Sequence, residues 1–168
     1  MSVPINMGFD ADGVFIRPPG FNFGKRVAKI DKVDMRFYRF SRFRLLRRVF
    51  YSLVRPNSEM IDLTKERKQR GDRIIVISGH SILCIREFKI YLTKVGMPFD
   101  DICLFDPNKF TSYLEFKLRM IIELGCDVYI EDLIEVVNYL EKHLDGQCKI
   151  IHYLGPGFID QVEQALIN

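Results

Sequence analysis

The stretch MGFDADGVFIRPPG, residues 7–20, runs from an apolar segment directly into two aspartates, Asp10 and Asp12. The residues before them form a short apolar run, PINMGFD, which is typical of a strand buried in a sheet. Gly13 follows the second aspartate and suits a sharp turn, because glycine tolerates positive φ. A buried strand therefore ends on paired carboxylates, and packing alone does not account for that choice of residues.

Strand and helix patterns alternate along the rest of the chain. Apolar runs predict strands at residues 4–10, 72–80, 101–106, 126–132 and 148–155. Periodicity and capping residues predict helices at residues 56–71, 81–96, 112–125 and 133–146, with a short one at the C-terminus. The first helix begins at Asn57 or Ser58 and ends at Gly71. Nearly continuous apolar strands separated by helices predict a parallel sheet covered on both faces, in one domain of 168 residues.

Polar residues stand at the ends of several predicted strands. The carboxyl ends of parallel strands share one edge of the sheet, and ligands bind there, near the point where the strand order reverses. These ends carry Asp10 and Asp12, then Ser78 and Gly79, then Glu131 and Asp132, and Lys117 lies on the helix before the fourth strand. We expect these side chains to form one site.

Four segments carry a resemblance to a known family. DADGV, VISG, Lys117 and YIED resemble, in this order, the four motifs of the haloacid dehalogenase (HAD) superfamily. The match covers the chain apart from residues 15–55. The resemblance implies an α/β, Rossmann-like three-layer sandwich with a five-stranded parallel sheet, a single domain over residues 1–168, and a small, basic helical cap inserted at 15–55. It also implies a magnesium-dependent phosphotransferase fold, most often a phosphatase.

The resemblance assigns roles to the acidic residues. Asp10 resembles the nucleophile that attacks phosphorus and forms an aspartyl-phosphate, and Asp12 resembles the general acid and base. The implied Mg²⁺ ligands are the Asp10 side chain, the backbone carbonyl of Asp12 and Asp132. Glu131 is then expected outside the metal's ligands, and Glu135 to assist through a water. The second aspartate favours phosphate esters over dehalogenation, because dehalogenases lack it.

The phosphoryl group is expected to be bound by the other motif residues. The Ser78 hydroxyl and Lys117 resemble the groups that stabilise its charge, with help from backbone N–H groups near Gly79. Lys109 competes with Lys117 for the lysine's role. Taken without the other motifs, Ser78 is better explained as the start of a loop.

The net charge is divided unevenly along the chain. Residues 25–55 hold eleven Lys and Arg against two Asp, a charge of +9, whereas the remainder holds fourteen basic against twenty acidic residues, −6. Within this segment Leu46, Val49, Phe50 and Leu53 follow helical spacing, with Arg44, Arg48 and Arg55 on the opposite face. We predict that Arg44, Arg47 and Arg48 bind or steer an anionic substrate. A solvated cap face, single-stranded nucleic acid and an anionic membrane surface are the alternatives.

The remaining residues with metal or redox chemistry show no site pattern. The cysteines lack a CxxC pair and border apolar runs, so we expect reduced core thiols at Cys84, Cys103, Cys126 and Cys148. The histidines show no ligand spacing, which argues against zinc: His80, His143 and His152. No apolar run reaches the roughly 18 residues that span a bilayer, and no signal-peptide pattern is present. We expect a cytoplasmic protein.

The sequence thus predicts a magnesium-dependent phosphatase that acts on a phosphate monoester. A small cap leaves the site open, which suits a large substrate or a site completed by a second copy of the chain. Two other functions remain open: a catalytically idle HAD-like protein that binds nucleic acid or membrane through its basic segment, and a 5'-nucleotidase-like phosphatase. The substrate itself is not specified by any motif.

Overall fold

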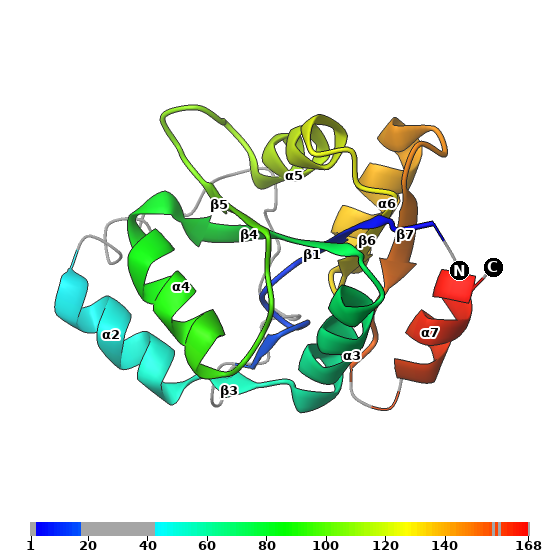
Figure 1. The fold of residues 1–168 in the computed structure, drawn as a ribbon. Helices are drawn as coiled ribbons and strands as arrows, with labels where there is room; N and C mark the ends of the chain where they lie inside the picture. Colours follow the sequence, from blue (N-terminus) through cyan, green and yellow to red (C-terminus); the bar gives the residue numbers. More distant parts are fainter. Residues whose placement is uncertain (1–2, 18–42, 156, 158, 168) are drawn as a thin grey trace.

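The computed structural model describes residues 3–17, 43–155, 157 and 159–167 (Figure 1). Five parallel strands form one sheet in the order β5-β4-β1-β6-β7. The strands are β1 (Asn6–Phe9), β4 (Arg73–Ser81), β5 (Asp101–Phe105), β6 (Val128–Glu131) and β7 (Lys149–His152). The chain builds the sheet outward from β1 to one side, then crosses to the other side. The strand order therefore reverses beside β1, which is where such sheets bind ligands.

Helices cover both faces of this sheet. On one face lie α3 (Ser58–Gln69), α4 (Ile85–Lys94) and α7 (Ile159–Ile167), and on the other lie α5 (Tyr113–Glu123) and α6 (Ile134–Leu144) (Figure 1). A short 3₁₀ turn, η2 (Ile82–Cys84), leads from β4 into α4. The predicted three-layer α/β arrangement and its five-stranded parallel sheet are confirmed.

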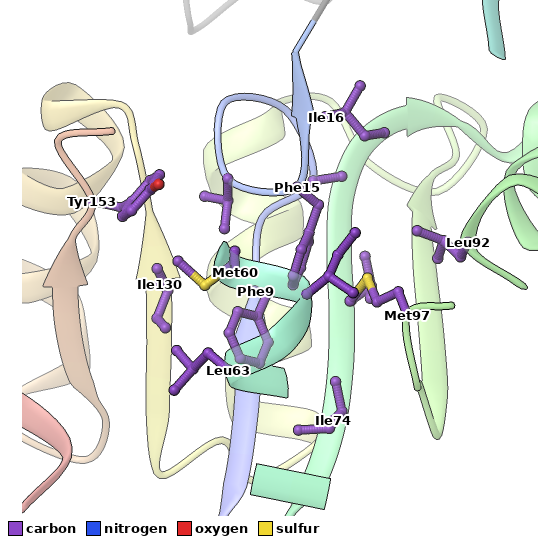
Figure 2. Close-up of a cluster of buried hydrophobic side chains, with 14 of the residues drawn as sticks. Phe9, Phe15, Ile16, Met60, Leu63, Ile74, Leu92, Met97, Ile130 and Tyr153 are labelled. Atoms are coloured by element: carbon purple, nitrogen blue, oxygen red, sulfur yellow. The ribbon is translucent and has the colours of Figure 1, made fainter. Parts of the chain in front are cut away.

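The two faces of the sheet are packed by alternate residues of each strand. In β4, Ile74 faces the α3 and α4 side, while Ile75 faces the α5 and α6 side. Phe9 of β1 lies against Met60 and Leu63 of α3 in the first of these cores (Figure 2). A strand buried on both faces must be apolar at every position, which explains the continuous apolar runs in the sequence.

Asn57 precedes α3 but does not cap it with its side chain. Its amide instead donates to the Val14 carbonyl at 2.7 Å and to the Tyr153 hydroxyl at 2.8 Å. Asn57 is almost fully buried, so these bonds satisfy a polar group that would otherwise be costly to bury. They also hold the loop after β1 against the start of α3.

The inserted segment is closed by a second, small sheet. Strand β2 (Ile16–Arg17) pairs antiparallel with β3 (Arg55–Pro56), and α2 (Arg44–Leu53) packs against α4. Residues 18–42 of the expected cap lie outside the described residues, so the cap boundaries at 15–55 remain a prediction.

Helix α2 buries only part of the apolar face that its spacing predicted. Its buried residue is Tyr51, whereas Val49 and Leu53 are 45% and 58% exposed. The reason is tertiary: Arg47 forms an ion pair with Glu87 of α4, and Tyr51 enters an aromatic cluster beside it. The predicted helix is confirmed. Arg44 and Arg48 of its arginine face are exposed, whereas its apolar face is divided: Leu46 and Phe50 are half-buried, and Val49 and Leu53 are exposed.

The cysteines behave as the sequence predicted. All four are free, and Cys84, Cys126 and Cys148 are buried while Cys103 is half-buried. Burial raises the pKa of Cys126 and Cys148 to about 12, which leaves these thiols protonated and unreactive. Across the described ranges, no helix combines the length and apolarity needed to cross a membrane.

Candidate active site

The end of β1 brings Asp10 level with the end of β6. Phe9 pairs with Ile130, and the backbone N–H of Asp10 donates to the Ile130 carbonyl at 2.9 Å. Asp10 and Glu131 therefore follow paired residues on adjacent strands. Both residues are buried, at 3% and 0% exposure.

Lys117 reaches this sheet edge from α5 and joins the two carboxylates. Its Nζ lies 2.9 Å from Asp10 Oδ1 and 2.5 Å from Glu131 Oε2. The other oxygen of Glu131 accepts the Leu133 N–H at 3.2 Å, and Tyr129 donates to Oε2 at 3.4 Å. Glu131 is thus held in place by Lys117, by the backbone and by Tyr129.

Burial changes the protonation of this group. It raises the pKa of Asp10 to about 7, and although Lys117 opposes the shift, Glu131 adds to it. Burial alone would lower the pKa of Lys117, but Asp10 and Glu131 raise it above its ordinary value, so the ammonium stays charged. Burial, together with the neighbouring Asp10 and Glu131, raises the pKa of Asp132 to about 9. Ionising all of these carboxylates at once requires additional positive charge.

The acidic residues fit a hard divalent cation. Oxygen atoms of Asp10, Glu131 and Asp132 all lie within 4.8 Å of one another. Asp132 Oδ1 is buried and has no hydrogen-bond partner among the described residues. A divalent cation would satisfy this carboxylate oxygen and favour ionisation of the neighbouring carboxyls, and carboxylate oxygens are the ligands that Mg²⁺ prefers.

Gly13 makes room for Asp132. Its φ is +75°, and a Cβ at this position would lie 1.8 Å from Asp132 Oδ2. The Gly13 N–H donates to the Ile16 carbonyl at 3.0 Å, which turns the chain back toward β2. The glycine of the first motif is therefore required by both the turn and the fourth-motif aspartate.

Asp12 points to a different partner. Its Oδ1 lies 2.9 Å from Nε2 of His80, and 36% of its side chain is exposed. The Nδ1 of His80 lies 2.6 Å from the Tyr51 hydroxyl. Burial alone would raise the pKa of Asp12, but the His80 imidazole holds it below its ordinary value, and Asp12 in turn raises the pKa of His80.

Ser78 and Gly79 lie near the end of β4. Ser78 is fully buried two residues beyond the Phe9–Val76 pair, and its Oγ accepts the His80 N–H at 3.2 Å. A Cβ on Gly79 would lie 3.4 Å from the Tyr113 ring, so the backbone runs close to that ring. Strand β4 continues past both residues to Ser81, with a register shift against β5.

Comparisons with known proteins rest on structure. Neither a protein-family model nor a curated protein matches the sequence. A chain of the Pnkp1/Rnl/Hen1 RNA repair complex is 16% identical, with a TM-score of 0.65, over 90% of this chain and 46% of that one. The HAD domain of the effector protein Lem4 from Legionella pneumophila, solved as an inactive mutant, is 12% identical with a TM-score of 0.59, over 99% of this chain and 95% of that one. The chain has the HAD fold. It spans less than half the length of the RNA repair chain.

A third structure with the HAD fold holds ligands. D,D-heptose 1.7-bisphosphate phosphatase from B. bronchiseptica, complexed with magnesium and phosphate, is 9% identical with a TM-score of 0.52, over 95% of this chain and 98% of that one. At such identities the likeness concerns the fold.

The HAD fold brings together most of the residues that the sequence singled out. Asp10, Lys117, Glu131 and Asp132 form one cluster, which favours Lys117 over the exposed Lys109 as the site lysine. The arginines lie elsewhere: Arg47 contacts Glu87 at 3.1 Å, Arg44 lies 3.9 Å from the same carboxylate, and Arg48 is exposed. Their role in binding substrate stays a prediction.

His80 and Tyr51 were missed as site residues. The spacing of metal-ligating histidines does not reveal His80, because His80 contacts a carboxylate and is not a predicted metal ligand. The available signal was position, because His80 stands directly after the VISG motif at a strand end. No local signal marks Tyr51, which joins the site only through the docking of α2.

Proposed function

We propose that this chain is a magnesium-dependent phosphate monoester hydrolase that works through an aspartyl-phosphate on Asp10. The observation that carries the proposal is the contact of Asp10 with Lys117 beside the unsatisfied oxygen of Asp132, at the ligand-binding edge of a HAD fold. The fold is also that of a phosphatase complexed with magnesium and phosphate. Asp10, Asp132 and the Asp12 carbonyl would hold Mg²⁺, which supplies positive charge to the phosphoryl oxygens and favours ionised Asp10.

In the first step, a carboxylate oxygen of Asp10 forms a bond to phosphorus as the bond from phosphorus to the ester oxygen breaks. Asp12 must carry a proton for this step, although His80 holds its pKa below its ordinary value; it gives that proton to the ester oxygen, which leaves as an alcohol. Lys117 stays protonated and stabilises negative charge on Asp10 and on the transferring group. The Ser78 hydroxyl and the Gly79 N–H are the further donors proposed for the phosphoryl oxygens.

In the second step, Asp12 is a carboxylate and takes a proton from water. The water oxygen bonds to phosphorus, the bond from phosphorus to Asp10 breaks, and inorganic phosphate is released. The pair of carboxylates at the end of β1 thus divides one displacement into two, with Asp10 as the nucleophile and Asp12 as the proton carrier.

The test is turnover of small phosphate monoesters with Mg²⁺. Asp10→Asn should lower kcat by at least about a thousandfold, because the amide is a poor nucleophile of nearly the same shape. Excess chelator should abolish wild-type turnover. Asp62→Asn, an exposed surface change, is the matched control and should keep full activity. Wild-type activity in the Asp10 variant, or in excess chelator, would refute the proposal.

A phosphorylated nucleic-acid end is the substrate class that we favour. The basic segment from residue 25 to 55 carries +9, and its described residues Arg44, Arg48 and Arg55 are exposed. The likeness to a chain of an RNA repair complex points the same way. A nucleotidase, which acts on a single nucleotide, and an idle HAD-like protein that binds a nucleic acid or membrane are the alternatives.

Salt dependence separates these candidates. On an oligonucleotide with a terminal phosphate, kcat/KM should fall as salt rises, since exposed charges are screened over about 8 Å at physiological ionic strength. Arg44→Gln with Arg48→Gln should remove most of this dependence. A mononucleotide hydrolysed as well as the oligonucleotide would favour the nucleotidase. Salt-sensitive binding without turnover would favour the idle protein.

A further inference from the structure

His80 links Asp12 to a helix of the inserted segment. Its Nε2 lies 2.9 Å from Asp12 Oδ1, and its Nδ1 lies 2.6 Å from the hydroxyl of Tyr51 on α2. His80 is 3% exposed and Tyr51 8%. Both ring nitrogens of this buried histidine are therefore within hydrogen-bond distance of side chains, one of them a site carboxylate.

The Asp12 carboxylate sets the direction of the hydrogen bonds through His80, and the Tyr51 hydroxyl is compatible with it. A phenol can donate or accept, so it satisfies Nδ1 whether or not that nitrogen carries a proton. A carboxylate only accepts, so Nε2 presents its proton to Asp12. Tyr51 thus holds the Nδ1 side of the ring while the Nε2–H of His80 is directed at Asp12 Oδ1.

Aromatic packing prevents the imidazole from turning away. The ring of His80 stacks on Phe88 of α4 at 5.4 Å between centroids, and on Tyr51 at 5.7 Å. Phe50 adds a contact at 5.8 Å. Rotating the imidazole would break both hydrogen bonds inside a buried cluster, which is costly.

We propose that Tyr51 and His80 are positioning residues that orient Asp12 for proton transfer. With Oδ1 held by His80, Oδ2 is the oxygen directed to the ester oxygen in the first step and to water in the second. The inference rests on the proposed function and adds to it that the docking of α2, which carries Tyr51, positions the acid and base.

Dependence on the leaving group distinguishes orientation of Asp12 from a general structural role. Hydrolysis of an ester with a good leaving group, such as p-nitrophenyl phosphate, needs little protonation of the leaving oxygen. Hydrolysis of glycerol phosphate depends on that protonation, because an alkoxide is a poor leaving group. The measured quantity is kcat/KM, which reports phosphoryl transfer to Asp10. In Tyr51→Phe we expect a loss of about tenfold or more for glycerol phosphate and under about threefold for p-nitrophenyl phosphate, as general acid catalysis contributes about 10²- to 10⁴-fold.

Tyr91→Phe is the matched control. Tyr91 packs on Tyr51 at 5.7 Å, and its buried hydroxyl has no hydrogen-bond partner among the described residues. This variant should have the wild-type kcat/KM on both substrates. His80→Gln, which can still donate to Asp12, should retain more activity on glycerol phosphate than His80→Phe.

The outcomes separate the inference from the function on which it rests. A wild-type protein without turnover on any ester overturns both. An active wild type whose Tyr51→Phe variant loses the same factor on both substrates, or none, overturns the inference alone. Equal activity of His80→Gln and His80→Phe on glycerol phosphate, with both proteins folded, would also overturn it.

Discussion

Gly13 shows how one residue joins two motifs that are far apart in the sequence. Its positive φ turns the chain after the paired aspartates, and its missing side chain leaves the space that the Asp132 carboxylate occupies. Other residues tolerate this backbone conformation poorly. At this position, however, the steric conflict with Asp132 is more severe than the backbone strain, because the contact would be 1.8 Å.

We expect Gly13→Ala to abolish magnesium binding while the fold is retained, because the new Cβ must displace Asp132. Isothermal titration with Mg²⁺ measures the loss. Gly146→Ala is the control: its φ is +76°, but a Cβ there would meet nothing within 4 Å. This control should cost about 1 to 2 kcal/mol of stability, as for other left-handed residues with a side chain, and should bind Mg²⁺ normally. Equal Mg²⁺ affinities in the two variants would contradict the role given to Asp132.

At the scale of the element, α2 is held to the domain by a buried ion pair and an aromatic cluster. Arg47 and Glu87 are 15% and 6% exposed, so their pairing is shielded from solvent. Burial alone would raise the pKa of Glu87, but its hydrogen bond with Arg47 holds it below its ordinary value. The helix exposes Val49 and Leu53 as a consequence of this docking.

Arg47→Gln should destabilise the protein by about 1 to 3 kcal/mol, because it leaves the buried Glu87 carboxylate poorly paired. Arg48→Gln removes an exposed charge one residue away and should change stability by less than about 0.5 kcal/mol. Urea unfolding measures both. Since α2 carries Tyr51, the Arg47 variant should also lose activity on glycerol phosphate. Equal stability of the two variants would show that the ion pair does not hold α2 in place.

For the whole molecule, the buried acidic cluster makes folding depend on pH and on metal. In the folded protein the pKa of Asp10 is about 7 and that of Asp132 about 9, against a value of 3.8 when exposed. Between pH 4 and these values the folded state therefore binds more protons than the unfolded state, so stability falls as pH rises. The pKa of Asp12 is lowered in the folded protein, so Asp12 affects stability only below about pH 4, where its contribution is lost as the pH falls.

Without metal, we expect the melting temperature to fall between about pH 5 and pH 8.5, by roughly 3 °C for each kcal/mol lost. Mg²⁺ should restore stability, and more so at the higher pH, because it binds ionised carboxylates. Asp132→Asn should flatten the pH dependence and remove most of the Mg²⁺ effect, while the contribution of His80, which also declines as pH rises, persists. A Mg²⁺ effect of equal size at both pH values would contradict the predicted coupling.

The sequence by itself determined the order of elements and the polar residues at the strand ends. The strands and helices can be predicted from the periodicity of neighbouring residues, and the residues of the motif around Asp10 are adjacent in the sequence. Both predictions are therefore independent of distant contacts. The same local signals predicted the helix that carries Tyr51. They could not predict that only part of its apolar face is buried.

Only the tertiary structure decided how these parts meet. It placed the ammonium of Lys117 beside Asp10, and it brought Tyr51 to His80 and His80 to Asp12 across 29 and 68 residues of sequence. It also set the strand order, which puts β1 between β4 and β6. A hydrogen bond between distant residues leaves no periodic trace in a sequence, because it depends on where whole elements dock rather than on the residues beside it.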